Sequence, residues 1–215
     1  EQVSYTSVTT NRAAYSEDFT NASYWSIYQG SFTANAGVAP DGTTTADKYV
    51  PNTTSSTDHW FYHRWFTISN NTFSVYAKAD GYNFISLSFY RGATNSQGVQ
   101  FNISTGVVVT SQNATGTITD AGNGWYRCSI FPTDSGNSEY AIFQPNDGST
   151  PNTSSYFRTT YAGDGTKGVL VWGAQLESTA LTGYLPTTSA SLSGITGVTR
   201  GVSGTTAATA SSGDT

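Results

Sequence analysis

The chain has 215 residues, of which 11% are charged, and its formal net charge at pH 7 is −5. Its nine lysine and arginine residues stand singly, whereas contact with nucleic-acid phosphates requires clustered cations. No apolar stretch approaches the roughly 20 residues of a membrane-spanning helix. The composition therefore argues against nucleic-acid binding and against membrane insertion.

The residue types favour a globular β-sheet domain. Ser, Thr, Asn and Gly are abundant and aromatic residues make up 14% of the chain, whereas the residues that favour helices are scarce. This aromatic content supplies enough apolar surface to offset the entropy lost on folding. The length suits one domain with a single well-covered core. We therefore expect one all-β unit.

The N-terminal segment, residues 1–11, alternates Val3 and Tyr5 with Ser and Thr. This pattern predicts an arm that pairs with a sheet edge or reaches a neighbouring subunit, and the domain is expected to begin near Arg12. Because the sequence starts with Glu1, a processed product and a fragment of a longer chain both stay open.

Alternating apolar and polar residues predict a dozen short strands, which are separated by Gly, Asn and Asp turns. Short strands at this regular spacing are typical of a β-sandwich. Trp125, Cys128 and Trp172 lie in apolar strands, so we expect them to be buried, with Cys128 unreactive. The expected strands are residues 24–33 (broken by a turn at 29–30), 46–50, 59–67, 72–79, 82–91, 99–103, 107–110, 115–119, 125–131, 139–144, 156–161 and 169–176.

Residues 187–215 consist almost entirely of Ser, Thr, Gly and Ala, with isolated apolar residues at Leu192, Ile195, Val198 and Val202. The segment is too sparse in apolar residues to build a core. It is either a flexible linker or an extended arm that docks on another subunit, and we favour docking. Strand addition to a sheet edge satisfies the backbone groups of both partners, so the two terminal arms predict a homo-oligomer. The alternative is that both arms fold back on their own domain.

Four phrases occur in a fixed order along the chain: Tyr15-Ser-Glu-Asp-Phe19, the turn-rich residues 39–48, Gly122-Asn-Gly-Trp-Tyr-Arg-Cys128, and the closing residues 161–177 with 183–188. The last phrase resembles the "WGAQLE…YIPTT" ending of jelly-roll, lectin-like modules in phage tail fibres and other virion appendages. The resemblance covers residues 15–188. It implies a jelly-roll β-sandwich, which we expect at residues 12–186 between the two arms, on a virion surface or outside the cell.

Motifs that would indicate catalysis are missing. The sequence has no phosphate-binding loop, no paired cysteines, no His-Glu metal motif and no nucleophile elbow, so we expect no enzyme. His59 and His63 share one face of a predicted strand but lie ~13 Å apart along it, too far for one metal ion. We therefore interpret both histidines as structural or surface residues.

Calcium is the one cofactor that the resemblance makes conceivable, because sandwich modules of this kind often hold a structural calcium near their first and last strands. Carboxylates are its preferred ligands, so Glu17, Asp18 and Glu177 are the conceivable ones. Calcium-bearing relatives usually carry an acidic residue inside the last strand, where this chain has Gln175. We therefore assign no metal site.

The aromatic run at residues 58–66 is the main candidate for binding. Alternation places Trp60, Tyr62, Arg64 and Phe66 on one face of the strand, and His59, Phe61, His63 and Trp65 on the other. Sugars bind by laying their C–H faces on aromatic rings while polar side chains bond the hydroxyl groups. A subunit interface uses the same residue types, and ordinary core packing is the third interpretation.

We therefore predict a non-enzymatic, adhesin-like module that recognises a glycan or cell-surface polysaccharide. The candidate contacts lie on the polar faces of strands expected to be neighbours: Trp60, Tyr62, Arg64, Tyr76 and Tyr90. The alternative is a structural, self-assembling fibre, filament or capsid-decoration subunit without a sugar site. A glycan-cleaving enzyme is the least favoured class, because no suitably spaced pair of carboxylates is apparent.

Overall fold

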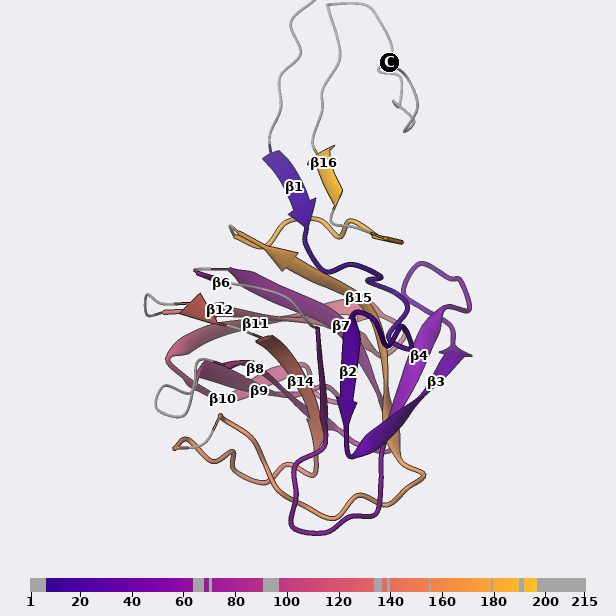
Figure 1. Cartoon of the computed structure of the whole chain (residues 1–215), viewed down its shortest axis with the longest axis vertical. Coiled ribbons are helices and arrows are strands. Elements are labelled where there is room, and N and C mark those ends of the chain that lie inside the picture. Colours follow the sequence, from indigo (N-terminus) through magenta and orange to yellow (C-terminus); the bar gives the residue numbers. More distant parts are fainter. Residues whose placement is uncertain are drawn as a thin grey trace, which may run out of the picture.

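The computed structural model describes residues 7–63, 68–69, 71–90, 97–133, 137–138, 140–154, 156–178, 180–189 and 192–196. Two six-stranded antiparallel sheets pack face to face (Figure 1). The predicted all-β sandwich is confirmed, whereas the jelly-roll order of connections stays a prediction. No helix among the described residues is long and apolar enough to cross a membrane.

The first sheet has the strand order β10 (Val107–Gln112), β9 (Gln97–Asn102), β8 (Phe84–Tyr90), β14 (Tyr140–Asn146), β5 (Trp60–His63) and β2 (Trp25–Tyr28). The second sheet has the order β11 (Ala114–Gly122), β12 (Trp125–Pro132), β7 (Thr72–Asp80), β15 (Gly168–Glu177), β4 (Ala46–Pro51) and β3 (Gly30–Gly37). Two short ribbons accompany them: β1 (Ser7–Asn11) with β16 (Leu192–Thr196), and β6 (Ile68–Ser69) with β13 (Asn137–Ser138).

The inner faces of the two sheets form the main core, as strand alternation predicts. In the central strands the inward-facing residues are buried against the other sheet, for example Val75 of β7 and Leu87 of β8. Cys128 is also fully buried, and its burial raises the pKa of the thiol, so the thiol is protonated and unreactive. Trp125 and Trp172 are buried as predicted, but they pack in a separate small cluster on the second sheet.

One predicted strand is wrong. Residues 156–161 belong to the long connection between β14 and β15, and form only isolated bridges. Tyr156 and Phe157 both have positive φ values, 59° and 53°, which a strand does not tolerate. The backbone of Thr159 is held by the Gln144 side chain instead, through bonds of 2.9 and 2.7 Å.

The two chain ends pair with each other. β1 and β16 form an antiparallel ribbon in which Val8 lies opposite Ile195, and the ribbon projects from the sandwich in Figure 1. The described part of the N-terminal arm therefore pairs with the C-terminal arm rather than with the edge of a sandwich sheet. Val198 and Val202 lie outside the described residues, and contact with another subunit stays a prediction.

Asp47 is a buried carboxylate that ties two loops to β4. One oxygen accepts a hydrogen bond of 2.9 Å from the Phe19 N–H and the other accepts one of 2.9 Å from the Asn35 N–H. The residue is only 2% exposed. Burial outweighs the two hydrogen bonds and raises the pKa of Asp47 from 3.8 to about 6.

This pKa predicts a pH dependence of stability. The folded protein binds the Asp47 proton more tightly than the unfolded chain does. The stabilisation of the fold by protonated Asp47 is therefore full below pH 3.8 and is lost as the pH rises through about 6. A difference of about two pKa units corresponds to roughly 3 kcal/mol of unfolding free energy. Urea denaturation between pH 4 and 7 should show this fall, and Asp47→Asn should flatten the profile whatever its absolute stability. If the free energy of unfolding falls equally with pH in the parent protein and in Asp47→Asn, the raised pKa does not belong to Asp47.

Candidate ligand-binding site

Three strands of the first sheet carry aromatic side chains on the outer face. In β5, Phe61 and His63 are buried inward, which leaves Trp60 and Tyr62 on the outer side. Tyr62 of β5 lies opposite Ile142 of β14. Two residues earlier in β14, Tyr140 lies opposite Tyr90 of β8. The period-two geometry of the strands therefore gathers these residues on one surface.

The connection from β14 to β15 (orange in Figure 1) lies against this face. Its Phe157 side chain is 1% exposed and packs against Gly98 of β9. The Gln100 side chain donates to the Ser149 carbonyl at 2.9 Å, which fixes an earlier part of the same connection. These contacts carry Tyr156 and Arg158 to the aromatic residues of the sheet.

Six side chains form a closed ring around a pocket of about 240 Å³, which Ile142 also lines. The ring centroids are 5.2 Å apart for Trp60 and Tyr62, 4.6 Å for Tyr62 and Tyr140, 5.6 Å for Tyr140 and Tyr90, and 5.0 Å for Tyr90 and Tyr156. The Arg158 guanidinium closes the ring, 4.6 Å from the Tyr156 centroid and 4.9 Å from the Trp60 centroid. Five aromatic rings and one cation thus surround one small space.

The charge of Arg158 is balanced beside the pocket. Its Nη1 donates to Asp58 Oδ2 at 2.6 Å, and the two side chains are only 12% and 22% exposed. The Nε of Arg158 and the indole Nε1 of Trp60 are buried, and neither has an acceptor among the described residues. Buried donors normally have a partner, so these two N–H groups beside the pocket are exceptions to that rule among the described residues.

Two consecutive residues in the connection beside the pocket, Tyr156 and Phe157, have strained backbones. Bulky residues with positive φ are uncommon, and Tyr156 and Phe157 adopt it in succession. Such conformations cost about 1–3 kcal/mol each and persist where surrounding contacts hold them. Here the burial of Phe157 and the bonds between Gln144 and Thr159 hold them. Strain of this kind clusters at ligand sites.

The structure brings together three of the five predicted contacts, Trp60, Tyr62 and Tyr90. Tyr76 does not belong with them, because β7 and β8 follow each other in the chain but lie in different sheets. Its ring packs 5.3 Å from Trp172 and 5.8 Å from Tyr184 on the second sheet. The expectation that all five lie on neighbouring strands is therefore wrong for Tyr76, and Arg64 lies outside the described residues.

Sequence reasoning missed four lining residues: Tyr140, Ile142, Tyr156 and Arg158. The alternation in the strand predicted at residues 139–144 could have identified Tyr140 and Ile142, because these two residues share a face. No local signal identifies Tyr156 and Arg158, because a non-local contact of Phe157 determines the position of their segment.

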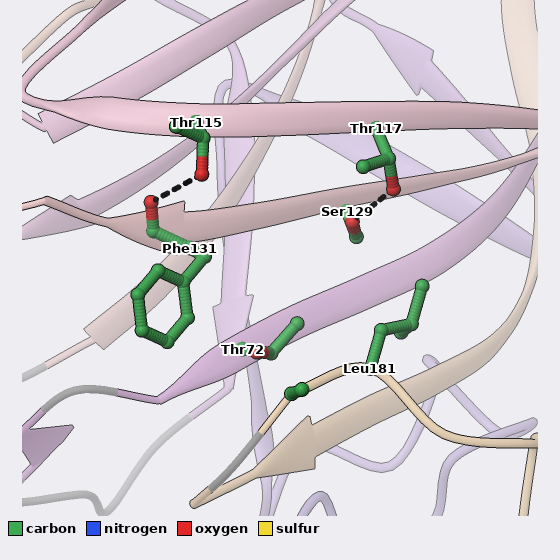
Figure 2. A pocket seen from close by; sticks show the side chains of 7 residues that line it. Thr72, Thr115, Thr117, Ser129, Phe131 and Leu181 are labelled. Carbon is green, nitrogen blue, oxygen red and sulfur yellow. Dashed lines mark hydrogen bonds between the residues drawn. The ribbon is translucent and has the colours of Figure 1, made fainter.

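A second pocket, of about 300 Å³, lies on the second sheet between β7, β11, β12 and the segment after β15. Figure 2 shows Phe131 and Leu181 on opposite sides of it, and the bond of 2.6 Å between the Thr117 and Ser129 hydroxyls. Its lining is apolar apart from hydroxyl groups and contains no charged side chain. It therefore offers few groups that could orient a polar ligand.

Both histidines are buried, so of the two predicted interpretations, structural or surface residues, the structural one holds. The Nδ1 of His59 lies 2.6 Å from the Gln29 carbonyl and its Nε2 lies 3.2 Å from the Tyr161 carbonyl. The Nε2 of His63 lies 3.2 Å from the Ala14 carbonyl. These contacts fix loops to β5.

The conceivable calcium ligands have protein partners. Tyr184 donates to Glu17, whose carboxyl pKa is raised by burial in spite of that bond, and Thr182 donates to Glu177. The Asp18 side chain accepts bonds from the backbone and hydroxyl of Thr20. Among the residues that the structure describes, no group of three or more His, Cys, Asp or Glu side chains could hold a metal ion. Calcium binding stays untested.

Neither the comparison with protein-family models nor that with curated proteins found a match to this chain. The functional argument therefore depends on the geometry of the aromatic pocket.

Proposed function

We propose that the protein is a non-enzymatic glycan-recognition module and that the aromatic pocket binds a sugar ring. The observation that carries the proposal is the closed ring of five aromatic side chains with two buried N–H donors that have no described acceptor. Aromatic faces suit the C–H faces of a sugar, and the hydroxyl groups of the lining tyrosines and the Arg158 guanidinium suit its oxygen atoms.

Two competing ligand classes fit this chemistry less well. Aromatic cages of similar size bind quaternary ammonium groups, but here the Arg158 guanidinium already makes the cation–π contacts with Trp60 and Tyr156 that such a group would require. Glycoside hydrolysis requires two carboxyl groups about 5–9.5 Å apart, and none of the residues lining the pocket is acidic. Binding without cleavage is the simpler function.

We further propose, from the resemblance described above, that the module belongs to a virion appendage or an extracellular fibre. A structural subunit is the second candidate, and two observations favour it. The β1–β16 ribbon presents strand edges away from the sandwich. Three successive valines of the end strand β10, Val107 to Val109, are 41–48% exposed. Exposed strand edges with apolar side chains pair readily with other chains.

Glycan-array screening tests the proposal, with the folded domain and the variants Trp60→Ala and Phe131→Ala as a matched pair. Phe131 is 39% exposed and lies on the other sheet, so it controls for the loss of an aromatic side chain. A central aromatic contact is worth about 2 kcal/mol or more, so Trp60→Ala should bind at least about tenfold more weakly.

Phe131→Ala should bind normally. Equal binding by Trp60→Ala and the parent protein would remove the pocket from the proposal. No binding to any bacterial or algal polysaccharide, together with an oligomeric mass in light scattering, would replace the glycan module by the structural subunit.

A further inference from the structure

We infer that the ligand is an oligosaccharide or polysaccharide of at least two sugar units, with one unit in the aromatic pocket and the next against Tyr28. This inference rests on the proposed function. Tyr28 is 41% exposed and its ring lies against Trp60, a residue that lines the pocket. Its position extends the sugar-binding surface beyond the pocket.

The geometry makes Tyr28 a continuation of the pocket wall. Tyr28 of β2 lies opposite Trp60 of β5. The two rings are stacked, with centroids 5.1 Å apart and planes inclined by 25°, and Trp60 is in turn 5.2 Å from Tyr62. Trp60 therefore joins two places where a sugar face can lie: the pocket on one side and the Tyr28 ring on the other.

The edge of the sheet leaves room for a second sugar unit. β2 is the end strand of the first sheet, and no further strand pairs with it in the described strand order. On the far side of the pocket, Tyr156 stacks on Tyr90 at 5.0 Å and the β14–β15 connection covers the sheet. A bound saccharide is thus confined at the connection, and one that leaves the pocket beside Trp60 meets Tyr28.

The charge of this surface suits a chain of neutral sugars. Arg158 is neutralised by Asp58, and the residues that line the pocket contain no other charged group. Tyr28 adds a ring and a hydroxyl without adding charge. Successive units can therefore bind by the same combination of ring stacking and hydrogen bonds.

Isothermal titration with neutral oligosaccharides of one to six units tests this inference, using laminarin, agarose, dextran and chitin as sources. In a series that binds, we expect the affinity to rise about threefold to tenfold from one unit to two or three, the value of one added aromatic contact. Tyr28→Ala should abolish this rise, so that longer oligosaccharides bind this variant no more tightly than a single unit does. Ile27→Ala is the matched control, because Ile27 is 43% exposed on the same strand but alternates to the opposite face.

The possible failures are distinguishable. If single units bind as tightly as hexamers, or if Tyr28→Ala binds hexamers normally, the second sugar position is wrong while the pocket stands. If no series binds to the folded protein, the proposed function fails and the inference fails with it. If Tyr28→Ala and Ile27→Ala weaken hexamer binding equally, the effect belongs to the strand rather than to the Tyr28 ring, and the inference is overturned.

Discussion

Replacing Asn11 by Ala is expected to lower the free energy of unfolding by about 3 kcal/mol or more, because buried groups would lose their partners. Asn11 is fully buried. Its Nδ2 donates to the carbonyls of Ala174 and Leu185 at 2.9 and 2.8 Å. Its Oδ1 accepts from the N–H groups of Ala13 and Leu176 at 3.0 and 3.1 Å. One side chain thus fastens the N-terminal segment to the last core strand.

Urea denaturation measures this effect, with Asn152→Ala as the matched control. Asn152 is an exposed residue whose side chain, among the described residues, bonds only to Ser154 in its own turn. Its replacement should cost less than about 1 kcal/mol, the net value of an ordinary hydrogen bond. If the two variants lose the same stability, the four bonds of Asn11 do not act as the anchor described here.

The features that could be predicted from the sequence are those that depend on neighbours along the chain. Alternation in residues 72–79 and 82–91 correctly indicated strands with one apolar face, and it correctly placed Trp60 and Tyr62 on the face opposite His63. A side chain's direction in a strand depends only on the period of two. For this reason, three of the pocket residues could be identified before the fold was known.

The association of strands into sheets could not be predicted in the same way. β7 and β8 are joined by a short turn, yet β7 pairs with β12 and β15 while β8 pairs with β9 and β14. The alternation in each strand is the same whether the chain makes a hairpin or crosses to the other sheet. Tyr76 was therefore grouped with Tyr90, although the two side chains lie on different sheets.

The pocket residues in the connection between β14 and β15 could not be predicted for a related reason. Residues 156–161 have the composition of a strand, but the positive φ values of Tyr156 and Phe157 are held by non-local contacts, among them the packing of Phe157 on Gly98, which is far away in the sequence. The boundary predicted at Arg12 has the same weakness. The bonds of Asn11 reach residues 163 to 174 positions away, so a local pattern assigns this residue to the arm rather than to the domain.

Gly98→Ala is expected to destabilise the fold by about 1–3 kcal/mol, the usual cost of overpacking, and to abolish sugar binding. A Cβ at this position would lie 2.1 Å from Cδ1 and 2.6 Å from Cβ of Phe157. The Phe157 Cβ is attached directly to the backbone, so a rotation of the ring cannot relieve the clash. The connection must move away from the sheet. Tyr156 and Arg158 flank Phe157 and would leave the pocket with it.

Two further variants separate this clash from a general effect of the substitution. Gly183→Ala is the control, because a Cβ there meets nothing within 4 Å, and its stability and binding should be unchanged. The double variant Gly98→Ala/Phe157→Ala lacks the ring that causes much of the clash. Its loss of stability should therefore be smaller than the sum of the losses in the two single variants. Additive losses would show that Gly98 acts independently of Phe157. Normal sugar binding by Gly98→Ala would show that Tyr156 and Arg158 are not required in the wall, which would reduce the site to the rings carried by the sheet itself.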